Sequence, residues 1–275
     1  MAVPMEHVLA LPELLEHILF SLDERTLLTS AQRVCTHWRG MIQQSPVLQE
    51  KLFFKPGRRT ASDAPESTTS DSAPAQQPTL NPLLIAAFPA IFRTNYLLPC
   101  QRPFRFSLRG IELITNPAKR TAYLRPNASW RSMFLQQPPA YSFGVFQECS
   151  ENPVTCEIMK SEGGLRMETL FELLFFHEDL TLCNYPNWIV WWGQSASVAF
   201  EKVLESSSAE SVDEPDLLVC AIVNSVGPGD PIEENEDQDV VNAVQDKYRE
   251  LGLEPKALEP EWVVEKTVFK EIWGP

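Results

Sequence analysis

The segment from Gly193 to Ser197 is the part of the sequence closest to a catalytic motif. It reads Gly-Gln-Ser-Ala-Ser and follows a strand-like run of tryptophan, isoleucine and valine. A nucleophile elbow carries a serine between two glycines on a sharp strand-to-helix turn. Here Ser197 replaces the second glycine, and His177 precedes Ser195, against the chain order of serine, acid and histidine. The pattern therefore does not favour a Ser195 hydrolase.

The cysteines and the other chemistry-bearing residues give no stronger motif. The six cysteines, at positions 35, 100, 149, 156, 183 and 220, form no Cys-x-x-Cys pair and have no histidine at zinc-finger spacing. In a reducing compartment they are expected to be buried thiols. The sequence contains no Gly-x-x-x-x-Gly-Lys phosphate loop. We expect a protein without catalytic residues, cofactor or metal.

The charge of the chain narrows the classes of partner. Its 275 residues include 23 Lys and Arg against 37 Asp and Glu, a formal net charge of −14. Residues 1–60 carry seven basic and six acidic residues, so the acidity belongs to the rest. Such a chain is a poor ligand for phosphate backbones or anionic membranes. With no apolar run of about 20 residues and no signal-like N-terminus, we expect a cytosolic or nuclear location.

Three short amphipathic helices are predicted at the N-terminus. Apolar residues recur at helical spacing from Leu11 to Leu22, where Pro12 suits a first helical turn. A second helix is predicted from Thr26, as its N-cap, to near Gly40, and a third from Ser45-Pro46 to Phe53. His17 and His37 are expected to face solvent. A unit of this size buries only about 60% of the surface that its unfolded chain exposes. Apolar residues left in water lose burial free energy, so those that the unit cannot bury are expected to pack against the rest of the chain or against another protein.

The identities and spacing of these residues, above all Val34-Cys35-x-x-Trp38, resemble the F-box family over residues 7–54. Asp23 departs from the pattern, since many members have a second proline there. The resemblance implies that the three helices interlock with the C-terminal helices of a Skp-family adaptor, and through it with a cullin. The residues that it assigns to adaptor binding are Leu11, Pro12, Leu14, Leu15, Ile18, Leu19, Leu22, Leu27, Leu28, Val34, Cys35 and Trp38.

A segment without core-forming residues follows the helices. From Gly57 to Thr79 there is no valine, isoleucine, leucine, methionine or aromatic residue. We expect residues 55–80 to be a disordered linker, or a loop between packed parts. Serines and threonines beside Asp63, Glu66 and Asp71 are candidate phosphorylation sites, although an unmodified solvated segment is favoured.

Residues 81–275 are predicted to form an α+β domain. Strand composition occurs at residues 104–114, 188–192, 217–226 and 262–269, and helices are expected at 129–139, 163–174, 196–204 and 240–251. The segments at 81–92, 129–139 and 163–174 also resemble stretches that follow the F-box in filamentous-fungal F-box proteins. No internal repeat of a leucine-rich or propeller kind is visible.

Three hypotheses follow for the function. The first is the substrate-recognition subunit of an SCF (Skp-cullin-F-box) ubiquitin ligase, with an unidentified protein target bound by residues 81–275. The second is a structural or regulatory module that binds the Skp adaptor without a ligase role. The third is an enzyme that carries an F-box, which a Ser195→Ala variant would test.

Overall fold

The computed structural model describes residues 11–57, 78–92, 111–149, 154–177, 188–205, 213–223, 236–255 and 262–266. The chain divides into two compact units. The helical unit comprises residues 1–83 and 133–139, and the sheet unit comprises residues 84–132 and 140–275. None of the helices within the described ranges is both long and apolar enough to span a membrane.

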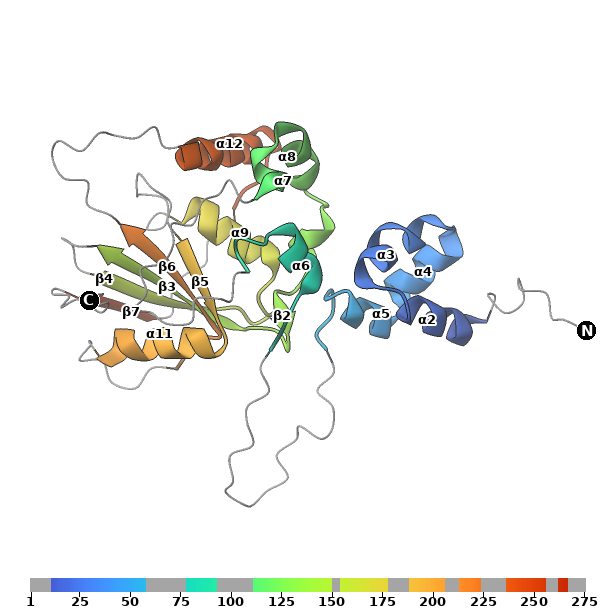
Figure 1. Ribbon diagram of the computed structural model, residues 1–275, viewed down its shortest axis with the longest axis horizontal. Helices are drawn as coiled ribbons and strands as arrows, with labels where there is room; N and C mark the ends of the chain where they lie inside the picture. The colour runs from blue at the N-terminus through green and yellow to red at the C-terminus, as the bar shows by residue number, and fades with distance from the viewer. Residues whose placement is uncertain are drawn as a thin grey trace, which may run out of the picture. The chain divides into compact units, whose positions relative to one another are not determined.

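The helical unit is built from short helices whose ends follow the expected local signals (Figure 1). Helix α2 begins at Pro12, and α5 begins at Pro46 after the side chain of Ser45 accepts a hydrogen bond from the amide of Leu48. The helices of this unit are α2 (Pro12–Phe20), α3 (Glu24–Thr29), the 3-10 turn η1 (Ala31–Arg33), α4 (Thr36–Gln44) and α5 (Pro46–Lys51). The first and third predicted helices are thus confirmed.

The second predicted helix is wrong in its boundaries and its continuity. It is divided into α3, η1 and α4, and Gly40 lies inside α4 rather than at a helix end. The cap is Asp23, whose side chain accepts from the amide of Thr26, and not Thr26 itself. Acceptance of these hydrogen bonds lowers the pKa of the Asp23 carboxyl. The residue that departs from the F-box pattern is therefore a conventional helix N-cap.

Two later segments of the chain complete the helical unit. Strand β1 (Thr79–Leu80) pairs antiparallel with β2 (Gln136–Gln137), and the buried side chain of Asn81 donates to the carbonyl of Phe134 at 3.0 Å. The amide of Phe134 donates in turn to the carbonyl of Phe53 at 2.8 Å. The helix predicted for residues 129–139 is wrong beyond its first turn, because only η4 (Ser129–Ser132) is helical. The backbone of 134–137 instead bonds to other parts of this unit.

The polar segment after α5 begins and ends at described residues of the helical unit. A Cβ on Gly57 would lie 3.2 Å from Oε1 of Gln137, and Thr79 pairs directly with Gln137 in the β1–β2 register. Residues 58–77 lie outside the described residues, and their predicted disorder stays a prediction. Because the described residues on both sides belong to the helical unit, the segment does not join one unit to the other.

The sheet unit is an α+β assembly around a mixed five-stranded sheet. The strand order is β5-β6-β3-β4-β7, and only β3 and β6 run parallel. Figure 1 shows α11 on one side of this sheet and α9 and α12 on the other. The strands are β3 (Ser142–Cys149), β4 (Val154–Lys160), β5 (Trp188–Trp192), β6 (Leu217–Val223) and β7 (Trp262–Lys266). The helices are α6 (Pro82–Ala87, which begins in the helical unit), α7 (Glu112–Thr115), α8 (Pro117–Tyr123), α9 (Met167–Phe176), α11 (Gln194–Glu205) and α12 (Glu236–Glu250).

Most of the predicted elements of this unit are present. Strands β5, β6 and β7 and helices α11 and α12 confirm the predicted segments, and α9 confirms the helix predicted for residues 163–174 except at its start, which is Met167. The strand predicted for residues 104–114 is wrong at its end, because Glu112 begins α7, and residues 104–110 lie outside the described residues. The hairpin of β3 and β4 was not predicted. Its first strand lies at the centre of the sheet, where Gly144 approaches β6 so closely that a Cβ would lie 2.6 Å from Cδ1 of Leu218.

Candidate docking surface of the N-terminal helices

Helix α2 carries two apolar stripes that have different surroundings. Leu15 and Leu19 are fully buried in the core of the helical unit. Leu11, Leu14 and Ile18, which we call the α2 face, are 50%, 43% and 38% exposed. Their spacing of three and four residues places them on one side of the helix, next to the buried stripe. One side of α2 therefore packs the unit together, and an adjoining side presents leucine and isoleucine to solvent.

The other predicted adaptor-binding residues divide in the same way. Leu27 is fully buried, and Leu22, Leu28 and Trp38 are half-buried and pack against the core. Pro12 and Cys35 are exposed, and Val34, in the turn before α4, is 61% exposed. The structure thus assigns Leu15, Leu19 and Leu27 to the core and leaves Leu11, Pro12, Leu14, Ile18, Val34 and Cys35 available to a partner.

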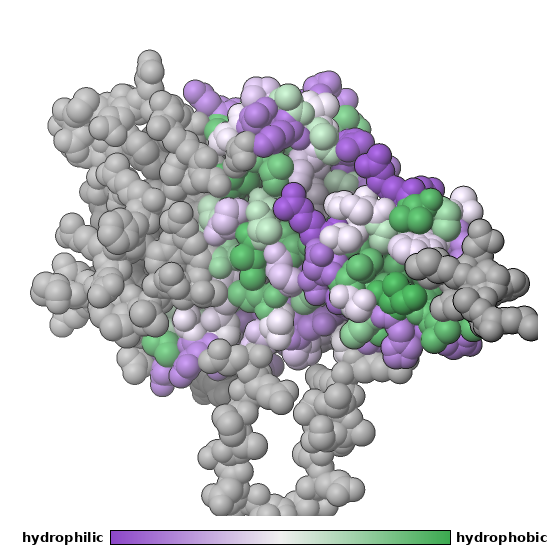
Figure 2. All heavy atoms as spheres, turned by 45° about the vertical axis from the view of Figure 1, so that its right-hand side comes forward, coloured by the Kyte–Doolittle hydropathy of each residue, from purple (hydrophilic) through white to green (hydrophobic). Residues whose placement is uncertain are grey.

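Two exposed apolar residues of these helices were not among the predicted site residues. Phe20 is half-exposed at the end of α2, and Val47 is exposed in the first turn of α5. Phe20 falls outside the helical spacing of the α2 face, so periodicity alone did not identify it. Figure 2 shows hydrophobic side chains gathered over the N-terminal helices. Both side chains add to the apolar surface that this unit leaves in water.

Polar contacts hold α5 against α2 and so fix the orientation of the α2 face. The hydroxyl of Ser45 donates to Oε1 of Glu16, and Nζ of Lys51 donates to the carbonyl of Phe20 at 2.6 Å. The same ammonium lies 4.8 Å from the centre of the Phe20 ring. These contacts also satisfy the carbonyl at the end of α2, which has no partner within the helix. The exposed leucines are therefore carried by a helix that α5 holds at its middle, through Glu16, and at its C-terminal end, through Phe20.

The predicted exposure is wrong for one cysteine and correct for two histidines of the N-terminal helices. Cys35 is exposed as the N-cap residue of α4, so the expectation of buried thiols is wrong at this position. Cys149, Cys156 and Cys220 lie in β3, β4 and β6, while Cys100 and Cys183 lie outside the described residues. His17 and His37 are exposed, as predicted. Within the described ranges, no group of three His, Cys, Asp or Glu residues is arranged to hold a metal ion.

The nucleophile-elbow segment adopts a strand-turn-helix path without the strained serine. Gly193 follows β5 with φ of +50°, and α11 begins at the next residue. Ser195 is therefore a residue of the first turn of α11, and its φ is not positive. In an elbow the nucleophile itself occupies the sharp, strained turn. The turn here is made by the glycine, which adopts this conformation at little cost.

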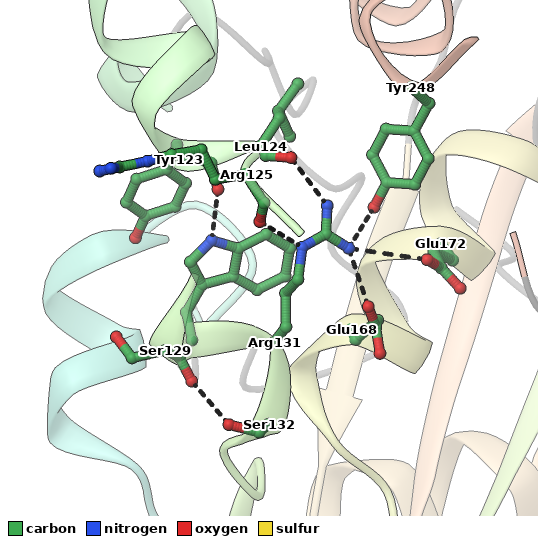
Figure 3. A network of polar contacts seen from close by, with 10 residues as sticks. Tyr123, Leu124, Arg125, Ser129, Arg131, Ser132, Glu168, Glu172 and Tyr248 are labelled. Atoms are coloured by element: carbon green, nitrogen blue, oxygen red, sulfur yellow. Dashed lines mark hydrogen bonds and ion pairs between the residues drawn. The ribbon is translucent and has the colours of Figure 1, made fainter. Parts of the chain in front are cut away.

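A polar cluster in the described part of the sheet unit surrounds Arg131 (Figure 3). Arg131 is buried, and its Nη1 donates to Oε1 of Glu168 and to the hydroxyl of Tyr248, both at 2.9 Å. Glu172 lies 3.7 Å from the same nitrogen. Nε and Nη2 donate to the carbonyls of Arg125 and Leu124.

This cluster has the character of a structural centre rather than a ligand site. Each guanidinium nitrogen of Arg131 already donates to a protein oxygen, and its carbon lies 4.9 Å from the Trp130 ring and 5.0 Å from the Tyr248 ring. Burial raises the pKa of Tyr248 well above its ordinary value, so the hydroxyl remains protonated. Four of the five guanidinium N–H groups thus donate to oxygens of the protein itself. The cluster joins η4, α9 and α12.

Comparison with protein-family models, with curated proteins and with solved structures found no match for this chain.

Proposed function

We propose that this protein is the substrate-recognition subunit of an SCF ubiquitin ligase, which binds a Skp-family adaptor through its N-terminal helices. The observation that carries the proposal is the division of α2 into a buried stripe and the exposed α2 face. A leucine or isoleucine side chain that is fully buried gains about 1.5–3 kcal/mol relative to one in water. Three such residues in line on one short helix are typical of a helix that docks on a partner.

The proposed activity needs no catalytic residue in this chain. A ligase subunit of this kind acts by holding its target close to the ubiquitin-conjugating enzyme, so that transfer becomes effectively intramolecular. The target would bind the sheet unit, which carries most of the negative charge of the chain. This charge favours a target with a basic surface, in an association that weakens as salt screens it.

The α2 face can be tested with a matched pair of substitutions. Ile18 and Ile85 are both helical isoleucines with 38% of their surface exposed, and Ile85 belongs to the sheet unit. Loss of a large interface anchor typically costs about 2 kcal/mol, so Ile18→Ala should weaken binding to a purified Skp-family adaptor by about 30-fold. Ile85→Ala should leave the dissociation constant unchanged. Equal affinities for both variants and the wild type would disprove docking through α2.

Core residues of the same helix provide the complementary control. Leu15→Ala should lower the free energy of unfolding by about 2–5 kcal/mol because it leaves a cavity in the helical core. Leu14→Ala, at an exposed position, should change stability much less while it weakens adaptor binding. If Leu14→Ala and Leu15→Ala differ in neither stability nor binding, the division of α2 into two stripes has no functional meaning.

A Skp-binding module without a ligase role is the second candidate, supported by the same surface. The two differ in what happens to proteins bound by the sheet unit. Cullin-dependent turnover of a captured target supports the ligase subunit, and an unchanged half-life on cullin depletion supports the module. Point substitutions suit this test better than deletion of residues 1–55, because deletion would remove the partners of residues 133–139.

A further inference from the structure

The stretch from Thr26 to Gln49, which follows Asp23 and Glu24 at the start of α3, is basic within an acidic chain. No Asp or Glu occurs from Thr26 to Gln49, a stretch of 24 residues. At the average frequency of 37 acidic residues in 275, about three would be expected there. The charged residues that this stretch does contain are Arg33 and Arg39, together with the titratable His37. The local charge is therefore opposite in sign to that of the whole chain.

The two arginines flank the most exposed apolar residue among the described side chains of the N-terminal helices. Arg33 directly precedes Val34, which is 61% exposed. Arg39 folds back from α4 and donates through Nε to the carbonyl of Gln32 at 3.2 Å, which places its side chain beside η1. Both arginines are exposed, and neither forms an ion pair with a carboxylate among the described residues. Their guanidinium groups retain free donors.

We infer that Arg33 and Arg39 bind an acidic segment of the Skp-family adaptor beside the contact made by Val34. This inference rests on the proposed function and adds to it the chemistry of the partner surface. Guanidinium groups form strong, directed hydrogen bonds to carboxylates. Exposed charges at the rim of an interface act mainly on the rate of association, because they steer the partner during encounter. In this proposal the apolar α2 face slows dissociation of the complex, and the arginine pair speeds its association.

The kinetics of binding to a purified Skp-family adaptor test this inference. In the full-length Arg33→Glu/Arg39→Glu variant, the association rate at low salt should fall about tenfold or more, while the dissociation rate changes less. In 1 M salt, where the Debye length is about 3 Å, the variant and the wild type should associate at similar rates. The matched control is Arg125→Glu/Arg249→Glu, which reverses two exposed arginines of the sheet unit and should associate as the wild type does.

The outcomes separate this inference from the proposed function. If the wild type binds the adaptor and the reversed pair associates equally fast at low salt, the arginine inference is wrong and adaptor docking still holds. If the reversed pair and the matched control slow association equally, the effect comes from net charge, and the inference is again wrong. If the wild type does not bind the adaptor at all, both proposals are wrong. Unchanged thermal unfolding of the variants would show that a rate change is not a folding defect.

Discussion

Gln137 donates through Nε2 to the carbonyl of Glu50 at 2.7 Å and joins two residues 87 positions apart in the sequence. The same nitrogen lies 3.2 Å from the carbonyl of Lys55, which also accepts from it. Both carbonyls belong to the end of α5 or to the turn after it, where helix carbonyls lose their intrahelical partners. A side chain from the middle of the chain therefore completes the last helix of the proposed docking unit.

Substitution of Gln137 should loosen the end of α5. Gln137→Glu removes both donors and places a carboxylate against two carbonyl oxygens. The Glu50 carbonyl keeps the amide of Phe53 as a donor and Lys55 is exposed, so each lost hydrogen bond should cost about 0.5–1.5 kcal/mol. We expect faster hydrogen exchange at the amides of Phe53 to Lys55 and a lower denaturant midpoint. Gln43→Glu, at an exposed position of α4, introduces the same charge and serves as the control. Equal effects of the two substitutions would contradict a role for the Gln137 hydrogen bonds.

Arg131 should be among the most sensitive residues of the sheet unit. Lysine keeps the positive charge but cannot reach the oxygens of Leu124, Arg125, Glu168 and Tyr248 together. Because loss of one partner leaves charged groups buried, Arg131→Lys should cost about 3 kcal/mol or more in the free energy of unfolding. Arg125→Lys, an exposed position, should cost less than about 0.5 kcal/mol. Similar melting temperatures for both variants would show that the cluster contributes little.

The buried tyrosines predict a loss of stability in alkali. Burial raises the pKa of Tyr123 and Tyr248 above their ordinary value, so above about pH 10 the unfolded chain releases protons that the folded protein retains. The contribution of the two tyrosines to the free energy of unfolding should therefore be constant below pH 10. Above pH 10 it should decline by up to about 1.4 kcal/mol per pH unit for each tyrosine. Tyr248→Phe should make the decline shallower. A slope identical to that of the wild type would rule out Tyr248 as a source.

Close packing of β3 against β6 makes Gly144 sensitive to the smallest substitution. The added Cβ would lie 2.6 Å from Cδ1 of Leu218, whose side chain is fully buried and has little room to move. Gly144→Ala should lower stability by about 1–3 kcal/mol. Gly163→Ala has no atom within 4 Å of the new Cβ and should be neutral or slightly stabilising. The melting temperatures of the two variants test this prediction. Equal values would show that β3 and β6 can move apart enough to accommodate the added Cβ.

Local signals in the sequence predict the helices better than they predict which residues face solvent. Pro12 and Ser45-Pro46 mark helix starts correctly because a cap depends on neighbouring residues. Periodicity could not separate Leu14 from Leu15, since both are leucines on the apolar side of one helix and only the packing of α4 and α5 decides which is buried. The β3–β4 hairpin was missed although its two strands are neighbours in the sequence, because Gly144 weakens the strand pattern of β3. The pairing of β3 with β6 joins segments distant in the sequence, which local patterns do not reveal.

The connection through residues 133–139 also has a consequence for synthesis on the ribosome. The last residue of the N-terminal helical segment, Gly57, is made 82 residues before Pro139, which at about 5–20 residues per second is an interval of about 4–16 s. During that interval the carbonyls of Glu50 and Phe53 are without the donors that Gln137 and Phe134 later provide. The nascent helices therefore lack these hydrogen bonds until residues 133–139 have been synthesised. A chaperone that recognises exposed apolar helices could bind the chain in those seconds, before the helical unit is complete.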